Sequence, residues 1–159
     1  MVVARETTSE WTLWAVAVSC ALHPVEEYFT GWQAWALQTL GIVMPTTRFF
    51  VANAVLVVVA LLCARVGWRR PTLCLVIPAA TLANAIFFHI LPALVQGRVS
   101  PGVYTATLLY VPFSSWALLG ARRDGVPGRA IAIAMVAGTL MMMGVVLGAR
   151  WLGSLSRVA

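Results

Sequence analysis

The sequence predicts a single all-α domain, a polytopic transmembrane bundle of about five helices. Of its 159 residues, 61% are hydrophobic and 10% are charged, whereas soluble domains average about 45–50% apolar and about 25% charged residues. Apolar stretches recur along the chain, and a membrane-spanning helix needs about 20 such residues. These observations predict one transmembrane domain with approximate spans at 11–32, 49–67, 72–95, 103–121 and 129–151.

The first span contains the most unusual sequence in the chain. Its apolar run from Trp11 to Leu22 gives only about 18 Å of helix, against a hydrocarbon core of about 30 Å. To cross, the helix must continue through the following His-Pro-Val-Glu-Glu sequence, and we predict a kink at Pro24. In the alternative, Pro24 begins a new helix, with Glu26 and Glu27 in its first turn at the membrane surface.

The next stretch differs in character from the second span. Residues 31–47 mix tryptophan, glutamine, glycine and proline, which is typical of an interfacial or re-entrant segment. The second span is rich in valine, alanine and leucine, with Asn53 as its polar residue. We expect Asn53 to make an interhelical hydrogen bond.

The third span carries a second polar pair, Asn84 and His89. Five residues correspond to about 140° on a straight α-helix, so the pair shares no narrow face unless the helix is distorted. His89 could simply be a buried imidazole that bonds to a neighbouring helix. Because the other histidine, His23, stands beside two carboxylates, we predict instead that His23 and His89 meet in one site.

The remaining spans follow a short turn that ends in Pro101-Gly102. Tyr104 and Tyr110 in the fourth span could reach the site or anchor the helix at the interface. In the fifth span, Gly144 and Gly148 form a small-residue motif that lets helices approach closely. This motif suits a contact within the lipid bilayer with a partner protein or with a second copy of the chain, as a homo-oligomer.

The net charge is +6, and all the lysine-or-arginine positions of the chain are arginines. With five spans, one side receives Arg5, Arg65, Arg69, Arg70, Arg122, Arg123 and Arg129, and the other receives Arg48, Arg98, Arg150 and Arg157. The positive-inside rule then places the N-terminus in the cytoplasm. Because the arginines are scattered through short connections, the charge does not indicate nucleic-acid binding.

The site residues suggest a membrane enzyme that acts on a lipophilic small molecule. His23, Glu26 and Glu27 stand at i, i+3 and i+4 and share one helical face. Ionisable groups at membrane depth cost roughly 2.5–3.5 kcal/mol each, so they usually serve a function. In the first interpretation, His23, Glu27 and His89 bind a divalent metal, zinc or iron, and Glu26 acts as general base. Spacing alone does not decide which glutamate is the ligand.

Two further interpretations remain open. In a metal-free cyclase or isomerase of an isoprenoid or polyketide, one of the adjacent carboxylates keeps its proton and acts as the acid. Aromatic side chains could then shield a cationic intermediate; the candidates are Trp14, Phe87, Phe88 and Trp116. The third interpretation is a proton or metal-ion pathway, or a small subunit of a membrane complex.

Three short motifs carry a family resemblance. They are His23-Pro24-Val25-Glu26-Glu27, then Asn84 with His89, then Ser100-Pro101-Gly102. With these motifs, the chain resembles the HXXEE-motif family of small bacterial integral membrane proteins, from about His23 to the fourth span. The resemblance implies a multi-pass protein of the bacterial cytoplasmic membrane and a membrane-bound enzyme with no firmly assigned reaction.

Overall fold

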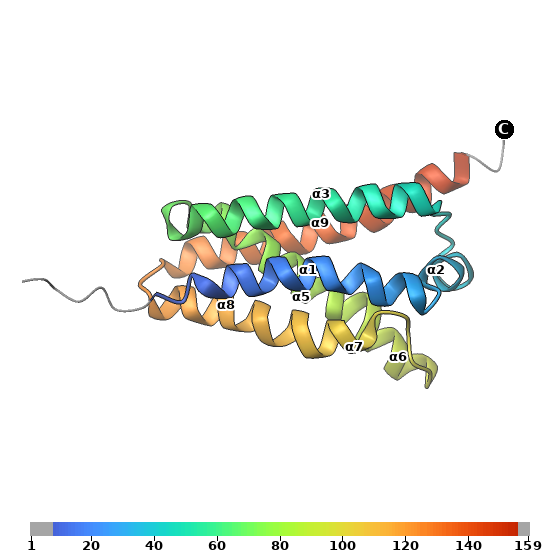
Figure 1. Ribbon diagram of the computed structural model, residues 1–159, viewed down its shortest axis with the longest axis horizontal. Coiled ribbons are helices and arrows are strands. Elements are labelled where there is room, and N and C mark those ends of the chain that lie inside the picture. Colours follow the sequence, from blue (N-terminus) through green and yellow to red (C-terminus); the bar gives the residue numbers. More distant parts are fainter. Residues whose placement is uncertain (1–7, 156–159) are drawn as a thin grey trace, which may run out of the picture.

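The computed structural model describes residues 8–155, with side chains for residues 8–151. Within the described residues the chain is all helical, with six continuous helical stretches and no strand. Figure 1 shows an elongated bundle in which α1 (Trp11–Phe29), α3 (Thr46–Val66), α8 (Val111–Arg123) and α9 (Gly128–Leu155) run roughly along one axis. The predicted all-α bundle is therefore confirmed, with one helix more than expected.

The additional helix is α2 (Trp32–Leu40), which lies at one end of the bundle beside the end of α1 (Figure 1). Gly31 separates α1 from α2 with a φ of 82°, a left-handed conformation that glycine adopts without steric cost. α2 occupies the stretch whose mixed composition predicted an interfacial or re-entrant segment. Because α2 is short, it adds a helix without adding a span.

Two of the bundle's helical stretches are composite. The third predicted span consists of α4 (Pro71–Cys74), α5 (Val76–Asn84), the π-helix η2 (Ala85–Ile90) and α6 (Leu91–Gln96). The fourth consists of α7 (Val103–Thr105), the π-helix η3 (Ala106–Tyr110) and α8. A short 3₁₀ turn, η1 (Gly67–Arg69), follows α3.

Three helices among the described residues are long and apolar enough to cross a membrane, which fits a membrane protein. They are Thr46–Arg69, Pro71–Gln96 and Gly128–Trp151. These coincide with the second, third and fifth predicted spans within a few residues. The first and fourth predicted spans are also helical, and they pack alongside these three. Their crossing of the membrane stays a prediction.

Helix α1 decides between the two interpretations of Pro24. It runs without a break from Trp11 to Phe29, so Pro24 lies inside the helix and the alternative of a new helix starting there is wrong. The helix ends where both the backbone N–H and the hydroxyl of Thr30 donate to the Glu26 carbonyl, at 2.8 and 2.6 Å. His23 and Glu27 therefore occupy successive turns of one helix.

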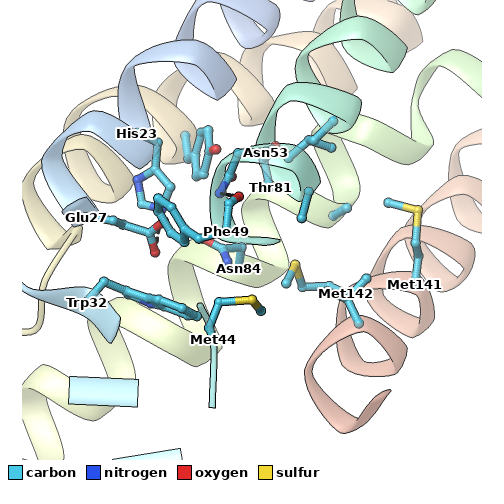
Figure 2. A pocket seen from close by; sticks show the side chains of 15 residues that line it. His23, Glu27, Trp32, Met44, Phe49, Asn53, Thr81, Asn84, Met141 and Met142 are labelled. Carbon is cyan, nitrogen blue, oxygen red and sulfur yellow. Dashed lines mark hydrogen bonds and ion pairs between the residues drawn. The ribbon is translucent and has the colours of Figure 1, made fainter. Parts of the chain in front are cut away.

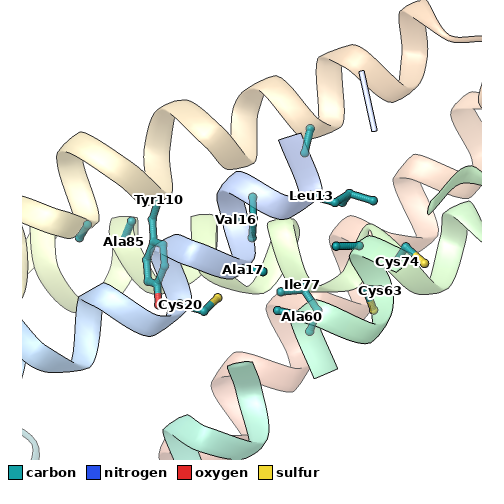
Figure 3. Packing of buried hydrophobic residues seen from close by; sticks show 13 residues of the cluster. Leu13, Val16, Ala17, Cys20, Ala60, Cys63, Cys74, Ile77, Ala85 and Tyr110 are labelled. Carbon is teal, nitrogen blue, oxygen red and sulfur yellow. The ribbon is translucent and has the colours of Figure 1, made fainter. Parts of the chain in front are cut away.

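Small side chains let the helices pack closely around a buried core between α1, α3, α5 and η3 (Figure 3). Ala17, Ala60, Ala85 and Ala106 are at most 2% exposed. On α9, a Cβ added to Gly138 would lie 2.5 Å from the Val76 carbonyl oxygen, so this glycine permits the close contact with α5. Gly144 and Gly148 have nothing within 4 Å, and their predicted contact with a second copy stays a prediction.

A polar cluster joins three chain segments at the start of α1, and we call it the end clasp: Ser9, Glu10, Trp68 and Asp124. The Asp124 carboxylate accepts from the Ser9 backbone N–H at 2.6 Å and from the Trp68 indole N–H at 2.8 Å. The Glu10 carboxylate accepts from the Trp68 backbone N–H at 2.6 Å. Each carboxylate of the end clasp therefore meets N–H donors.

Candidate functional site

The candidate site lies toward the other end of α1 and is formed by His23, Glu27 and His89. Oε1 of Glu27 stands 3.5 Å from Nε2 of His23 and 3.6 Å from Nε2 of His89. The two imidazole rings meet edge to face with centroids 4.7 Å apart. All three residues are at most 5% exposed, and their ligand atoms lie within 4.8 Å of one another, so the group could hold a metal ion.

The π-helix η2 explains how His89 reaches this site. At its end the Leu91 N–H bonds to the carbonyl of Ile86, five residues back, instead of the four of an α-helix. A turn widened by one residue brings positions five apart round to a similar direction. Asn84 and His89 thus both face the site region despite their offset of five, which a straight α-helix would separate by about 140°.

The turn before α7 fixes the orientation of His89. Its Nδ1 lies 2.8 Å from the Pro101 carbonyl oxygen, and the Ser100 hydroxyl donates to the His89 carbonyl at 2.9 Å. A carbonyl oxygen only accepts, so the ring proton of neutral His89 resides on Nδ1. Its Nε2 then carries a lone pair, is buried and has no hydrogen-bond partner.

His23 is held in the same tautomer through Thr105. The Thr105 hydroxyl donates to Oε2 of Glu26 at 2.5 Å, because a carboxylate only accepts. The hydroxyl oxygen, 2.8 Å from Nδ1 of His23, is therefore free to accept the proton of that nitrogen. Nε2 of His23 is likewise a buried lone-pair atom with no hydrogen-bond partner. Both Nε2 atoms and the carboxylate of Glu27 thus present lone pairs to one another.

Glu26 points to a different set of partners from its neighbour Glu27. Besides the Thr105 hydroxyl, its carboxylate accepts the backbone N–H groups of Thr105 at 2.7 Å and Tyr104 at 3.2 Å. Glu26 therefore anchors α7 onto α1. The two adjacent carboxylates, three and four residues after His23, have separate structural roles.

Gly102 lies directly over the cluster and leaves no room for a side chain. A Cβ at this position would stand 2.8 Å from Cε1 of His89, 2.9 Å from Cγ of Glu27 and 2.9 Å from Cε1 of His23. Its φ of 85° also lies in the left-handed region that favours glycine. The Pro-Gly turn that the sequence marked as a connection thus closes one side of the site.

An apolar cavity of about 220 Å³ opens beside His23 and Glu27 (Figure 2). Trp32, Phe49 and Tyr110 supply its aromatic wall, and Met141 and Met142 of α9 border it from the opposite side. Tyr110 packs against the His23 ring with centroids 4.5 Å apart. Such a cavity accepts an apolar ligand and brings it against the polar cluster.

Not every residue singled out from the sequence joins the site. Asn84 borders the cavity, but the side chain of Tyr104 is 59% exposed and the residue reaches Glu26 only through its backbone N–H. Of the four aromatics considered for cation shielding, the described cavities include only Phe88, which borders a smaller one. The aromatic lining of the larger cavity comes instead from Trp32, Phe49 and Tyr110.

Thr105 and Gly102 are the residues that site prediction from the sequence missed. Thr105 is one of several hydroxyl residues in the fourth span, and no pattern separates it from Thr107. Gly102 was recognised as part of a turn, but a turn signal does not reveal what lies beneath it. Both contacts depend on how the turn folds back over α1 and η2.

Fold and site together define a helical protein with membrane-span-like helices and a buried His–Glu–His group beside an apolar cavity. The model of the family described as "Protein of unknown function with HXXEE motif" matches residues 14–117, and the chain belongs to this family. The motif itself is His23-Pro24-Val25-Glu26-Glu27. No curated protein and no solved structure matches the chain.

Proposed function

We propose that this protein is an integral membrane enzyme that acts on a lipophilic small molecule, with His23, Glu27 and His89 as the ligands of a zinc or iron ion. The observation that carries this proposal is the fixed tautomer of both histidines. Two buried Nε2 lone pairs face one carboxylate oxygen at 3.5 and 3.6 Å. Groups that present only lone pairs repel one another unless a cation lies between them.

The donor set supports a metal ion as that cation. Two imidazoles and one carboxylate form the ligand set of catalytic His₂Glu zinc sites and of the facial triad of non-haem iron enzymes. With metal–ligand bonds of about 2.0–2.2 Å, tetrahedral ligand atoms stand about 3.4 Å apart. The distances from Oε1 of Glu27 to the two Nε2 atoms are close to this value.

The surrounding residues support the ligands in the manner of known metal centres. Metal-binding histidines usually donate their second N–H to a carbonyl or carboxylate, which fixes ring orientation. His89 does so to the Pro101 carbonyl, and His23 does so through Thr105 to Glu26. Since Glu26 already accepts three hydrogen bonds, its proposed role is to position His23 and α7, in place of the general base predicted from spacing.

The adjoining cavity supports a lipophilic substrate. Its lining is predominantly apolar, and it adjoins His23 and Glu27 directly. When bound, a zinc or iron ion would supply Lewis-acid or oxidative chemistry. The chain itself would exclude bulk water with Trp32 and Phe49, whose rings pack with centroids 5.5 Å apart, and would hold the substrate against the ligands.

Elemental analysis of the detergent-purified protein tests the metal site. We expect near-stoichiometric zinc or iron in the parent, loss in His23→Ala and Glu27→Gln, and retention in Glu10→Gln. The Glu10→Gln control changes a carboxylate of the end clasp, remote from the cluster in the fold. A well-folded parent that stays metal-free after supplementation would overturn the metal site and turn attention to metal-free acid–base catalysis by a cyclase or isomerase.

The enzymatic part needs a separate experiment. The metal-loaded parent and Glu27→Gln are incubated with a total lipid extract and compared by untargeted mass spectrometry. We expect at least one lipophilic species to be consumed by the parent alone, with a product appearing in step. A metal-loaded parent that alters no species would contradict the enzyme and favour an ion pathway or a membrane subunit.

A further inference from the structure

The residue Asn84 borders two cavities, and its buried side-chain oxygen has no hydrogen-bond partner among the described residues. The larger cavity adjoins His23 and Glu27, and a smaller one of about 70 Å³ extends between α2 and α9. Trp32, Met44, Asn84, Met142 and Val145 border both cavities. Because they share these lining residues, the two cavities are adjacent to each other.

Asn84 is the polar side chain on this shared wall whose hydrogen bonds are missing. The residue is half-buried, and its Oδ1 is buried with no hydrogen-bond partner among the described residues. An unpaired buried carboxamide oxygen is destabilising, because burial removes its hydrogen bonds to water and nothing in the fold replaces them. Other polar side chains of the larger cavity are engaged: Thr81 bonds to Ser114 at 2.8 Å, and Asn53 donates to the Phe49 carbonyl at 3.0 Å.

The smaller cavity indicates what extends beyond Asn84. Its other lining residues are apolar side chains of α2, the following connection, η2 and α9: Leu40, Ile42, Phe88, Val146 and Ala149. A ligand that reaches from the metal ligands past Asn84 therefore ends in an apolar tail. The two volumes together lie near the low end of the roughly 300–1,000 Å³ of small-molecule sites, which favours a small lipid over a whole phospholipid.

We propose that Asn84 is a specificity residue that binds the hydroxyl group of a small lipophilic alcohol, with the alcohol's apolar chain in the cavity between α2 and α9. A carboxamide offers one acceptor and one donor group, and a hydroxyl both donates and accepts, so one hydroxyl can satisfy either end. A plain alkyl chain leaves the amide unpaired. This inference rests on the proposed function for the site, and it adds the class of substrate.

Fluorescence quenching by brominated chains tests the preference directly, without turnover. A terminally brominated decanol and the matching bromodecane are titrated into the detergent-solubilised protein, and the signal of Trp32 is taken as the difference between the parent and Trp32→Phe. Trp32 borders both cavities, so bromine in either compartment lies near its ring. This difference removes quenching of the other tryptophans by probe in the detergent.

We expect the parent to bind the brominated alcohol about 5–10-fold more tightly than the bromoalkane, the value of one net hydrogen bond. Asn84→Leu keeps the wall filled and removes the amide, so the preference should fall below about twofold. Asn53→Leu, the matched control on the larger cavity, should keep the preference. An equal affinity for both probes in the parent, or a preference that survives Asn84→Leu, overturns the proposal.

Metal content measured on the same samples separates this inference from the proposed function. Asn84 is no ligand, so Asn84→Leu should retain the metal of the parent. A parent that holds metal but does not discriminate between the probes refutes the alcohol site alone. A metal-free parent that still discriminates, with the preference lost in Asn84→Leu, refutes the metal and keeps the alcohol site.

Discussion

The bundle has two polar clusters that contain carboxylates, the end clasp and the candidate site. They differ in the groups that these carboxylates contact. In the end clasp, Glu10 and Asp124 accept from backbone and indole N–H groups at 2.6–2.8 Å. In the site, Glu27 accepts no hydrogen bond from any described residue, and it faces the lone pairs of two imidazoles at 3.5 and 3.6 Å. The end clasp is satisfied by the fold alone.

This difference distinguishes a cluster that is complete within the fold from a candidate functional site, whatever the residue types are. Carboxylates are rare in this chain, and each of Glu10, Glu26 and Asp124 is paired with N–H donors. Such pairing stabilises the fold. Glu27 is the described carboxylate without such donors, and the two histidines beside it are held in the tautomer that leaves Nε2 free to bind a cation. Missing hydrogen-bond partners therefore identify the candidate site more clearly than a buried charge alone does.

The largest effect is expected from adding one methyl group to the turn over the site. Gly102→Ala places a Cβ within 3 Å of three site residues, whereas Gly125→Ala has the same φ of 85° and nothing within 4 Å. The two variants share the backbone strain, so their difference reports the overpacking alone, about 1–3 kcal/mol of unfolding free energy. Gly102→Ala should also lose its metal. Thermal unfolding in detergent and elemental analysis measure both effects, and equal melting temperatures would refute the steric account.

The second prediction is that removing a carboxylate changes the free energy of unfolding differently at the two clusters. Asp124→Ala leaves the Ser9 and Trp68 donors unpaired and should lower the free energy of unfolding by about 1–3 kcal/mol, with metal content unchanged. In chelator-treated protein, Glu27→Gln should be neutral or stabilising, because its new N–H₂ group can donate to an Nε2 lone pair. Denaturant unfolding of both variants checks the signs. A destabilised metal-free Glu27→Gln would contradict the comparison.

Removing the hydroxyl that joins Glu26 to His23 should have a more moderate effect. Thr105→Val keeps the shape of the side chain but frees the His23 ring to adopt either tautomer. Loss of such a supporting partner typically weakens metal binding by about 10–100-fold. Competition with a chelator of known affinity measures the change. Thr107→Val, an exposed position two residues along, is the matched control and should bind metal like the parent.

The smallest effect is expected at Ser100, whose hydroxyl holds the backbone of His89 and not its ring. Ser100→Ala removes one neutral hydrogen bond, so unfolding free energy should fall by about 0.5–1.5 kcal/mol. Metal affinity should change less than in Thr105→Val, because the bond from Nδ1 of His89 to the Pro101 carbonyl remains. The same chelator competition ranks the metal affinities of the two variants. A larger loss of metal affinity in Ser100→Ala than in Thr105→Val would mean that support of the His89 backbone matters more than support of the His23 ring.

The sequence was sufficient for the helical bundle and for grouping His23, Glu27 and His89. Composition predicts membrane-type helices, and the rarity of ionisable groups in apolar runs singles out the motif. The different partners of Glu26 and Glu27 were not predictable from the sequence, because adjacent positions on a helix differ only in the direction of their side chains. That direction is decided by which backbone N–H groups of the next helical stretch arrive there.

Other details depended on local backbone geometry that no pattern encodes. The periodicity of an α-helix separates Asn84 from His89, and only the π-helix η2 brings both toward the site. Tyr104 and Tyr110 are equally plausible from composition, yet the first is exposed and the second packs on His23. Likewise, the Pro-Gly dipeptide predicts a turn, but it does not predict that the turn packs against the two imidazoles.

The π-helix η2 has a consequence for how this chain tolerates insertions and deletions. Relative to a plain α-helix, the segment Ala85–Ile90 accommodates a surplus residue. Removing one residue between Asn84 and His89 would restore ordinary α-helical winding with an offset of four, about 40° on the helix, so the imidazole would keep its direction toward α1. The hydrophobic content and the helix itself would survive this deletion. The site should therefore tolerate a single-residue deletion between Asn84 and His89, because the widened turn already absorbs the surplus residue.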